Sequence, residues 1–130
     1  MNVFVDTNVL MDVLLDRKPF VTDSQQVWFL AERGRLCAHV SVLSFPSVYY
    51  VLRKLSGAEQ AARAMIMLRD VFTPAACDQQ ILNQAIDAGF QDFEDAIQYF
   101  SAMHVDAACI ISRNPQHFPM SGIPVLTPRE

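Results

Sequence analysis

The feature that most constrains this chain is its opening, where a short apolar run ends abruptly in polar residues. Residues 2–5 are apolar enough for a buried strand, Asp6 and Thr7 follow directly, and the spacing over 9–15 then predicts a helix. A strand of this kind delivers a carboxylate to its own carboxyl end, where open α/β sheets build their binding sites. Asp6 is therefore well placed to hold a metal ion. The structural alternative, in which Asp6 or Thr7 only caps the helix, stays open.

The rest of the chain alternates between apolar runs and helical patterns. Further strands are expected at 36–42, 71–73, 107–111 and 123–126. Helices are expected at 44–55, 58–70, 78–88 and 91–104, after a helix that Thr22, Asp23 or Ser24 caps and Gly34 ends. This alternation predicts an α/β fold, three-layer α/β/α with a central parallel sheet of four to five strands.

Composition limits the class of protein. A length of 130 residues with 52% hydrophobic and 18% charged residues predicts a single domain over 1–130 with a real core. No apolar run approaches the ~20 residues that span a bilayer and no leader segment is evident, so we expect a cytoplasmic protein without membrane contact. The net charge of −4 argues against non-specific nucleic-acid binding through a basic face. It leaves room for an acidic metal pocket.

Cysteine and histidine offer no recognisable site. Cys37, Cys77 and Cys109 are widely spaced among apolar residues, which predicts reduced core thiols and argues against a disulfide framework or a zinc site. The three histidines are equally scattered and form no spacing typical of a ligand pair.

A second acidic cluster begins the helix expected at 91–104. At about 100° per residue, Asp92 and Asp95 share one flank of the helix and Glu94 lies on the other. The core stripe between them is expected to contain Phe93, Ala96, Ile97, Phe100, Met103 and His104. Acidic residues in a first turn also meet the positive end of the helix dipole, which is the structural explanation for such a cluster. Asp95 borders the core stripe, and a partly buried carboxylate needs a partner.

Taken together, these segments resemble the PIN-domain family. The similarity rests on residues 5–10 (VDTNVL), 92–96 (DFEDA) and 111–114 (ISRN), followed by Phe118 and by residues 123–128 (IPVLTP). It extends over essentially the whole chain in order and spacing. The chain looks most like the small bacterial VapC-like toxin-type ribonucleases of toxin–antitoxin pairs.

The resemblance implies a fold, a cofactor and a set of site residues. Family members gather carboxylates at the strand ends to hold one or two Mg²⁺ or Mn²⁺ ions and cut RNA. Carried over by position, Asp6, Asp92 and Asp95 are the expected catalytic residues. The expected metal ligands are Asp6, Asp95 and Asn114, the last through its amide oxygen, and we expect these three side chains to share one pocket.

Neighbouring residues take supporting roles in this interpretation. Thr7 and Ser112 would reach metal-bound waters or else cap backbone groups. Asn8 would position Asp6, as residues behind a metal ligand commonly do. Arg113 would contact the RNA substrate at the scissile phosphate, with a solvated surface charge as the alternative.

The chain also departs from the family pattern. Ser47 stands where a glutamate is usual, Asn114 where a fourth acidic residue is usual, and His117 where a further aspartate is common. The remaining charge suffices for one Mg²⁺ or Mn²⁺ ion, weakly bound and completed by water.

Three functions remain open from the sequence. The first is a toxin-type ribonuclease with RNA and an antitoxin protein as partners. The second is a non-catalytic PIN-like module that binds RNA or protein. Adjacent Tyr49 and Tyr50 cannot both face one core, so one of them could serve a homodimer or an antitoxin helix. The third, a haloacid-dehalogenase-type phosphotransferase, would require an acid/base aspartate where Asn8 stands.

Overall fold

The computed structural model describes residues 1–118 and 122–129 as an α/β fold built on one parallel sheet. The sheet has five strands in the order β3-β2-β1-β4-β5, and every neighbouring pair runs parallel. The strands are β1 (Asn2–Val5), β2 (Cys37–Ser41), β3 (Thr73–Ala75), β4 (Cys109–Ile111) and β5 (Val125–Leu126). This confirms the predicted fold class and the upper of the two predicted strand counts.

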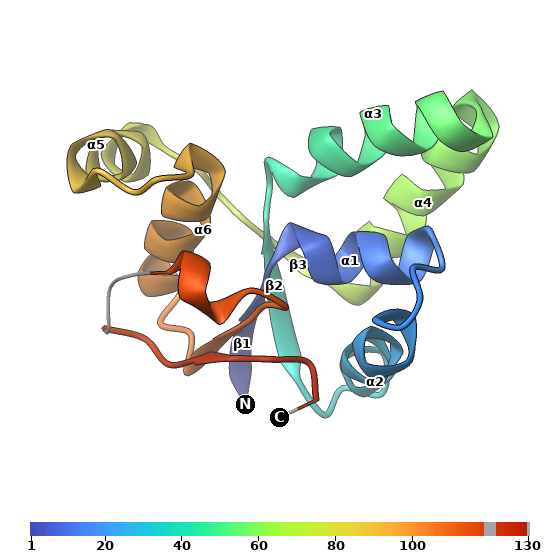
Figure 1. The fold of residues 1–130 in the computed structure, drawn as a ribbon, viewed down its shortest axis with the longest axis horizontal. Coiled ribbons are helices and arrows are strands. Elements are labelled where there is room, and N and C mark those ends of the chain that lie inside the picture. Colours follow the sequence, from blue (N-terminus) through green and yellow to red (C-terminus); the bar gives the residue numbers. More distant parts are fainter. Residues whose placement is uncertain (119–121, 130) are drawn as a thin grey trace.

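Helices cover both faces of the sheet (Figure 1). They are α1 (Thr7–Leu14), α2 (Val21–Glu32), α3 (Ser44–Ser56), α4 (Ala58–Val71), α5 (Gln79–Ala88) and α6 (Phe93–His104), followed by a short 3₁₀ helix η1 (Pro115–His117). In the described part of the chain, none of them combines the length and apolar character that crossing a bilayer requires.

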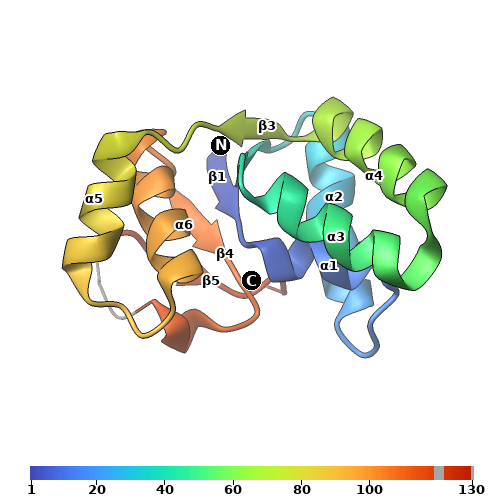
Figure 2. The ribbon, with the colours of Figure 1, turned by 90° about the horizontal axis from the view of Figure 1, so that it is seen from above.

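The two faces of the sheet bury separate sets of side chains. Val3, Val5 and Val40 pack with α1 to α4 in the larger core cluster. Phe4 and Ile110 point to the opposite face, where Tyr99 of α6 packs on them. Seen from above, α5 and α6 stand apart from the other helices across the sheet (Figure 2). Successive side chains of a strand point to opposite faces, so each strand contributes to the core on both sides of the sheet.

Strand β3 lies two residues later than the sequence predicts. It spans Thr73–Ala75 instead of 71–73, and so it contains Pro74. Pro74 is tolerated because β3 is an edge strand, where a missing backbone N–H costs no ladder hydrogen bond on the open side. The preceding helix α4 uses Val71 as its last residue.

The predicted start of α2 is also wrong. The helix begins at Val21 after Phe20, and no side chain caps it. Ser24, one of the predicted caps, is instead fully buried and bonds to Asp12. The helix expected at 78–88 is α5, in which Asp78 is the N-cap and Gly89 ends the helix in the left-handed region at φ 70°.

The core stripe predicted for α6 is partly wrong. Phe93 and Met103 are 48% and 46% exposed, and His104 is exposed as well, whereas Gln98 and Tyr99 are each 1% exposed. The spacing of apolar residues does not predict which face of α6 is buried, because a polar residue, Gln98, occupies a buried position. Its hydrogen-bonding groups find partners inside the protein, as described below.

The cysteines are all free, as predicted, but they are not all core residues. Only Cys109 is buried, Cys77 is half-buried and Cys37 is exposed.

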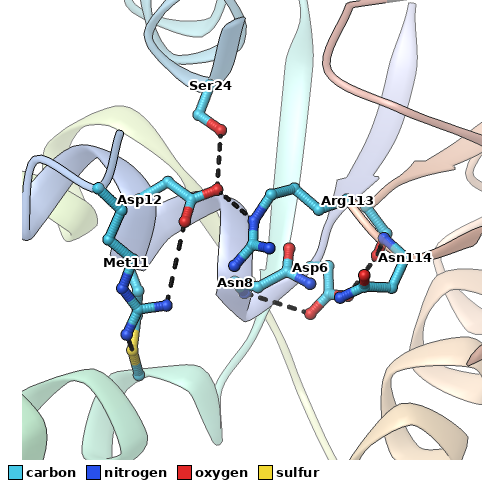
Figure 3. Close-up of polar contacts among 9 residues, drawn as sticks. Asp6, Asn8, Met11, Asp12, Ser24, Arg113 and Asn114 are labelled. Carbon is cyan, nitrogen blue, oxygen red and sulfur yellow. Dashed lines mark hydrogen bonds and ion pairs between the residues drawn. The ribbon is translucent and has the colours of Figure 1, made fainter. Parts of the chain in front are cut away.

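A buried carboxylate, Asp12, connects α1 and α2 to the segment after β4. Asp12 is fully buried, its Oδ2 accepts hydrogen bonds from Ser24 Oγ at 3.2 Å and Arg113 Nε at 2.6 Å, and Arg17 lies 3.9 Å from its Oδ1. Figure 3 shows Ser24 and Arg113 approaching Asp12 from different sides. The guanidinium of Arg113 also lies 4.0 Å from the ring centroid of Phe20. Arg113 is thus held between two elements and is not a solvated surface charge.

We expect Asp12→Ala to lower the free energy of unfolding by about 3 kcal/mol, because it leaves the largely buried Arg113 without its anion. Urea denaturation measures this change. Asp87→Ala, at an exposed position of α5, is the matched control and should change stability by less than ~0.5 kcal/mol. Equal effects of the two substitutions would contradict a structural role for the Asp12 pair.

Candidate functional site

The candidate site lies where the strand order reverses. β1 is flanked by β2 on one side and β4 on the other, and the ends of β1 and β4 are paired at Val5 and Ile111. The carboxyl ends of these two strands are therefore neighbours in the sheet. Such a switch point is where open α/β sheets place ligands. Asp6 leaves the end of β1 and Ser112 leaves the end of β4.

Asp6 is held in a single orientation by three hydrogen bonds. It is 5% exposed, and its Oδ1 accepts from Gln98 Nε2 at 3.0 Å and from the backbone N–H of Asn8 at 3.3 Å. Its Oδ2 accepts from Ser112 Oγ at 2.6 Å. The bond from Asn8 makes Asp6 the N-cap of α1. Asp6 therefore does cap α1. It also accepts hydrogen bonds from Gln98 and Ser112, which capping alone does not require.

Gln98 is the residue that sequence reasoning missed. Its side chain donates to Asp6, and its Oε1 accepts from Thr7 N at 3.0 Å and Thr7 Oγ1 at 3.2 Å. Thr7 also shares a 2.7 Å hydrogen bond with Ser44 at the start of α3. A single glutamine on a helix carries no motif. The signal that could have found it is its spacing, three residues after Asp95 on the same helix face.

The polar residues after the strands support Asp6 in different ways. Ser112 is fully buried and accepts a hydrogen bond from the backbone N–H of Asn114 at 3.1 Å while donating to Asp6. Asn8 contributes its backbone N–H, and its buried Oδ1 has no hydrogen-bond partner among the described residues. Asn114 is thus linked to Asp6 through Ser112. Figure 3 includes Asp6, Asn8 and Asn114.

Asp95 is the second buried carboxylate of the site. It is 8% exposed, and its Oδ2 has no hydrogen-bond partner in the described part of the chain. Burial, followed by the charges of Asp6 and Asp92, raises the pKa of Asp95 from 3.8 to about 7, while His117 acts in the opposite direction. A cation beside Asp95 would relieve this unfavourable environment.

Asp92 and Glu94 complete the acidic cluster from exposed positions. Asp92 is the N-cap of α6, since its Oδ1 accepts from Asp95 N at 3.2 Å, which supports the helix-start explanation for this residue. Glu94 was predicted on the far flank of the helix, but its carboxyl is partly desolvated and lies within electrostatic reach of Asp6. Burial raises the pKa of Glu94, and the charges of Asp6 and Asp92 raise it further, against a hydrogen bond from Thr7.

A cavity of about 460 Å³ opens beside these residues. Its lining includes Gln91, Asp92, Asp95, Gln116 and His117, and it does not include Asp6 or Asn114. Nδ1 of His117 lies 3.6 Å from Oδ2 of Asp95. The expectation that Asp6, Asp95 and Asn114 share one metal pocket stays a prediction. Asp95 faces the cavity, and Asp6 is coupled to it by charge.

The donor set suits a hard cation with few protein ligands. Over residues 1–118 and 122–129, no group of three or more His, Cys, Asp or Glu side chains is arranged to hold a metal ion. The unpartnered Oδ2 of Asp95 and the neighbouring charge of Asp6 nonetheless fit a divalent cation that keeps several waters. Ser47 stands at the position where a glutamate is usual, and its hydroxyl donates a hydrogen bond to the carbonyl of Leu43.

Comparisons with known proteins point to one family. The family model described as PIN domain matches residues 2–116. Ribonuclease VapC1 of Aquifex aeolicus (strain VF5) is 28% identical, over 98% of this chain and 91% of that protein.

Solved structures share the fold. A toxin-antitoxin complex from Klebsiella pneumoniae is similar at TM-score 0.72 and 23% identity, with 98% of each chain covered. VapBC2 from Rickettsia felis, bound to a DNA fragment from its promoter, is similar at TM-score 0.71 and 10% identity, covering 96% of this chain and 97% of that one.

We expect Asp95→Asn to stabilise the metal-free protein more at high pH than at low pH. The folded-state pKa of Asp95, about 7, exceeds the ordinary 3.8, so the folded state holds this proton more tightly than the unfolded state does. Wild-type stability is therefore lost as pH rises from about 4 to about 7, and the loss is complete above that range. The asparagine variant lacks this loss.

Urea denaturation at about pH 5 and about pH 8 measures the difference between wild type and variant. The exposed Asp87→Asn serves as the control. A gain in Asp95→Asn that is the same at both pH values would show that its carboxyl is not a destabilising charge.

Proposed function

The chain belongs to the PIN-domain family, and from that premise we propose that it is a divalent-metal-dependent endoribonuclease of the toxin–antitoxin type. The supporting observation is the rigidly held, buried Asp6 beside Asp95 at the switch point of the sheet. A 28% identical relative that carries the name ribonuclease adds to it.

The side chains of this site have different roles in the proposed cleavage of a phosphodiester. Asp6 and Asp95 would hold one Mg²⁺ or Mn²⁺ ion, with the amide oxygen of Asn114 as a further ligand. When bound, such an ion lowers the pKa of a water molecule and stabilises charge on the phosphoryl oxygens. Gln98 and Ser112 keep Asp6 from turning away. Asp92, exposed at the cavity rim, accepts a hydrogen bond from an incoming water and orients it for attack.

Arg113 contributes positive charge near the RNA backbone. Its side chain is 20% exposed and follows Ser112 directly, which places it beside the site. Because Asp12 holds its Nε, the guanidinium is fixed in direction, and a fixed guanidinium is suited to phosphate recognition.

An apolar surface over α3 and α4 fits a protein partner such as an antitoxin helix or a second copy. Tyr50, Leu55 and Ile66 are 65%, 64% and 52% exposed, and Val42, Phe45, Met65 and Pro74 line a hollow nearby. Exposed apolar patches of this kind mark protein interfaces. Sedimentation of wild type and Tyr50→Glu tests self-association: a dimer that the substitution dissociates supports the second copy.

We expect the wild type to cleave a structured RNA in Mn²⁺, and Asp6→Asn or Asp95→Asn to reduce cleavage by at least about 100-fold while the fold is retained. Gel analysis of RNA fragments, with circular dichroism of each variant, measures both effects. Asp87→Asn is the matched control and should cleave normally.

Two outcomes would overturn this function. Cleavage that persists in chelator or in Asp6→Asn would exclude the proposed metal site. A folded wild type that binds RNA without cutting it would favour the non-catalytic module, which the lost carboxylates at Ser47 and Asn114 make the second candidate.

A further inference from the structure

Two atoms that can bind a metal face each other at the cavity beside α6. Nδ1 of His117 and Oδ2 of Asp95 are 3.6 Å apart. A direct charge-assisted hydrogen bond would measure about 2.7–2.9 Å, so the two groups are not joined in that way. Two ligands of one cation at ~2.1 Å are about 3.0 Å apart in an octahedron and about 3.4 Å in a tetrahedron. The observed gap is close to the separation of ligands that share a cation.

The carboxylate oxygen is available for such a role. Oδ2 of Asp95 is buried and has no hydrogen-bond partner among the described residues. A buried carboxylate oxygen without a partner costs free energy, and Asp95 lines a cavity that has room for a hydrated ion. A cation bound beside this oxygen would therefore be stabilising.

The backbone holds His117 in place while its ring stays accessible. His117 ends the turn η1, where its N–H donates to the carbonyl of Asn114 at 3.0 Å. The next residue, Phe118, is 6% exposed and belongs to the core under α6. The imidazole itself is 53% exposed. A short shift of the imidazole ring can therefore bring Nδ1 closer to Oδ2 of Asp95 without moving the backbone.

The identity of this ligand decides which cation fits. Mg²⁺ strongly prefers oxygen ligands, whereas Mn²⁺, Co²⁺ and Zn²⁺ accept imidazole nitrogen readily. The other groups at the cavity are carboxylates and the neutral amides of Gln91 and Gln116. An imidazole among them changes the site from an all-oxygen set to a mixed one.

We propose that His117 supplies a nitrogen ligand to the cation held at Asp95, and that the site in consequence prefers Mn²⁺ to Mg²⁺. This rests on the proposed function, since it names the cation that the same site selects. The scattered spacing of the histidines in the sequence hides the pair, because His117 reaches Asp95 only through the fold.

Pulsed electron paramagnetic resonance with Mn²⁺ alone tests the ligand directly. The wild type should show hyperfine coupling to a directly bound nitrogen, and His117→Asp should lose it while still binding Mn²⁺ through oxygen. His104→Gln, at an exposed position near the end of α6, is the matched control and should retain the coupling.

Calorimetric titration with MnCl₂ and MgCl₂ measures the preference. In His117→Asp, the ratio of Mg²⁺ to Mn²⁺ dissociation constants should fall by at least about tenfold, since residues at or behind a metal ligand commonly alter affinity by ~10–100-fold. Circular dichroism confirms that each variant is folded.

The results separate this proposal from the proposed function. Mn²⁺ that binds the wild type without nitrogen coupling, and with the same preference in His117→Asp, overturns the role of His117 and leaves the metal site standing. A wild type that binds neither ion overturns both. Loss of coupling in His117→Asp with an unchanged His104→Gln spectrum supports the proposal.

Discussion

The structure around the site depends on how one buried charge is partnered. Asp6 is 5% exposed at the end of the central strand, and its carboxylate would be unstable there without hydrogen bonds. Its partners come from three elements: Asn8 at the start of α1, Gln98 in α6 and Ser112 after β4. The carboxylate of Asp6 is therefore hydrogen-bonded to segments about a hundred positions away in the sequence. The same hydrogen bonds that stabilise this carboxylate also fix its orientation.

The acidic cluster shows the opposite balance, since its buried carboxylate is destabilised in the metal-free protein. Asp95 has a pKa of about 7 because burial and the charges of Asp6 and Asp92 disfavour its ionised form. A bound cation would offset this cost in free energy. Asp12 is also buried, but its carboxylate accepts hydrogen bonds from Arg113 and Ser24. Its role is therefore structural. Asp12 and Asp95 thus differ in role because a guanidinium bonds directly to Asp12, whereas Asp95 has only the half-exposed imidazole of His117 at 3.6 Å.

The sequence predicted the sheet, the position of Asp6 at a strand end and the partial burial of Asp95, because strand ends and helical spacing leave local patterns. It could not predict Gln98, whose burial is favourable only because Asp6 and Thr7 satisfy it across the fold. It also placed Phe93 and Met103 in the core, although α6 turns that face to solvent. His117 looked isolated for the same reason: its approach to Asp95 is made by the turn η1 and the anchoring of Phe118, neither of which spacing reveals.

Anomalous diffraction from crystals grown with Mn²⁺ tests the central claim most directly, namely that Asp6 and Asp95 create a cation site at the switch point. We expect a single manganese peak within about 2.3 Å of a carboxylate oxygen of Asp95, on the side that faces Asp6. The peak should be absent from crystals of Asp95→Asn grown in the same way. A manganese ion bound elsewhere, or none beside Asp95 at a concentration that saturates the protein in solution, would contradict this account.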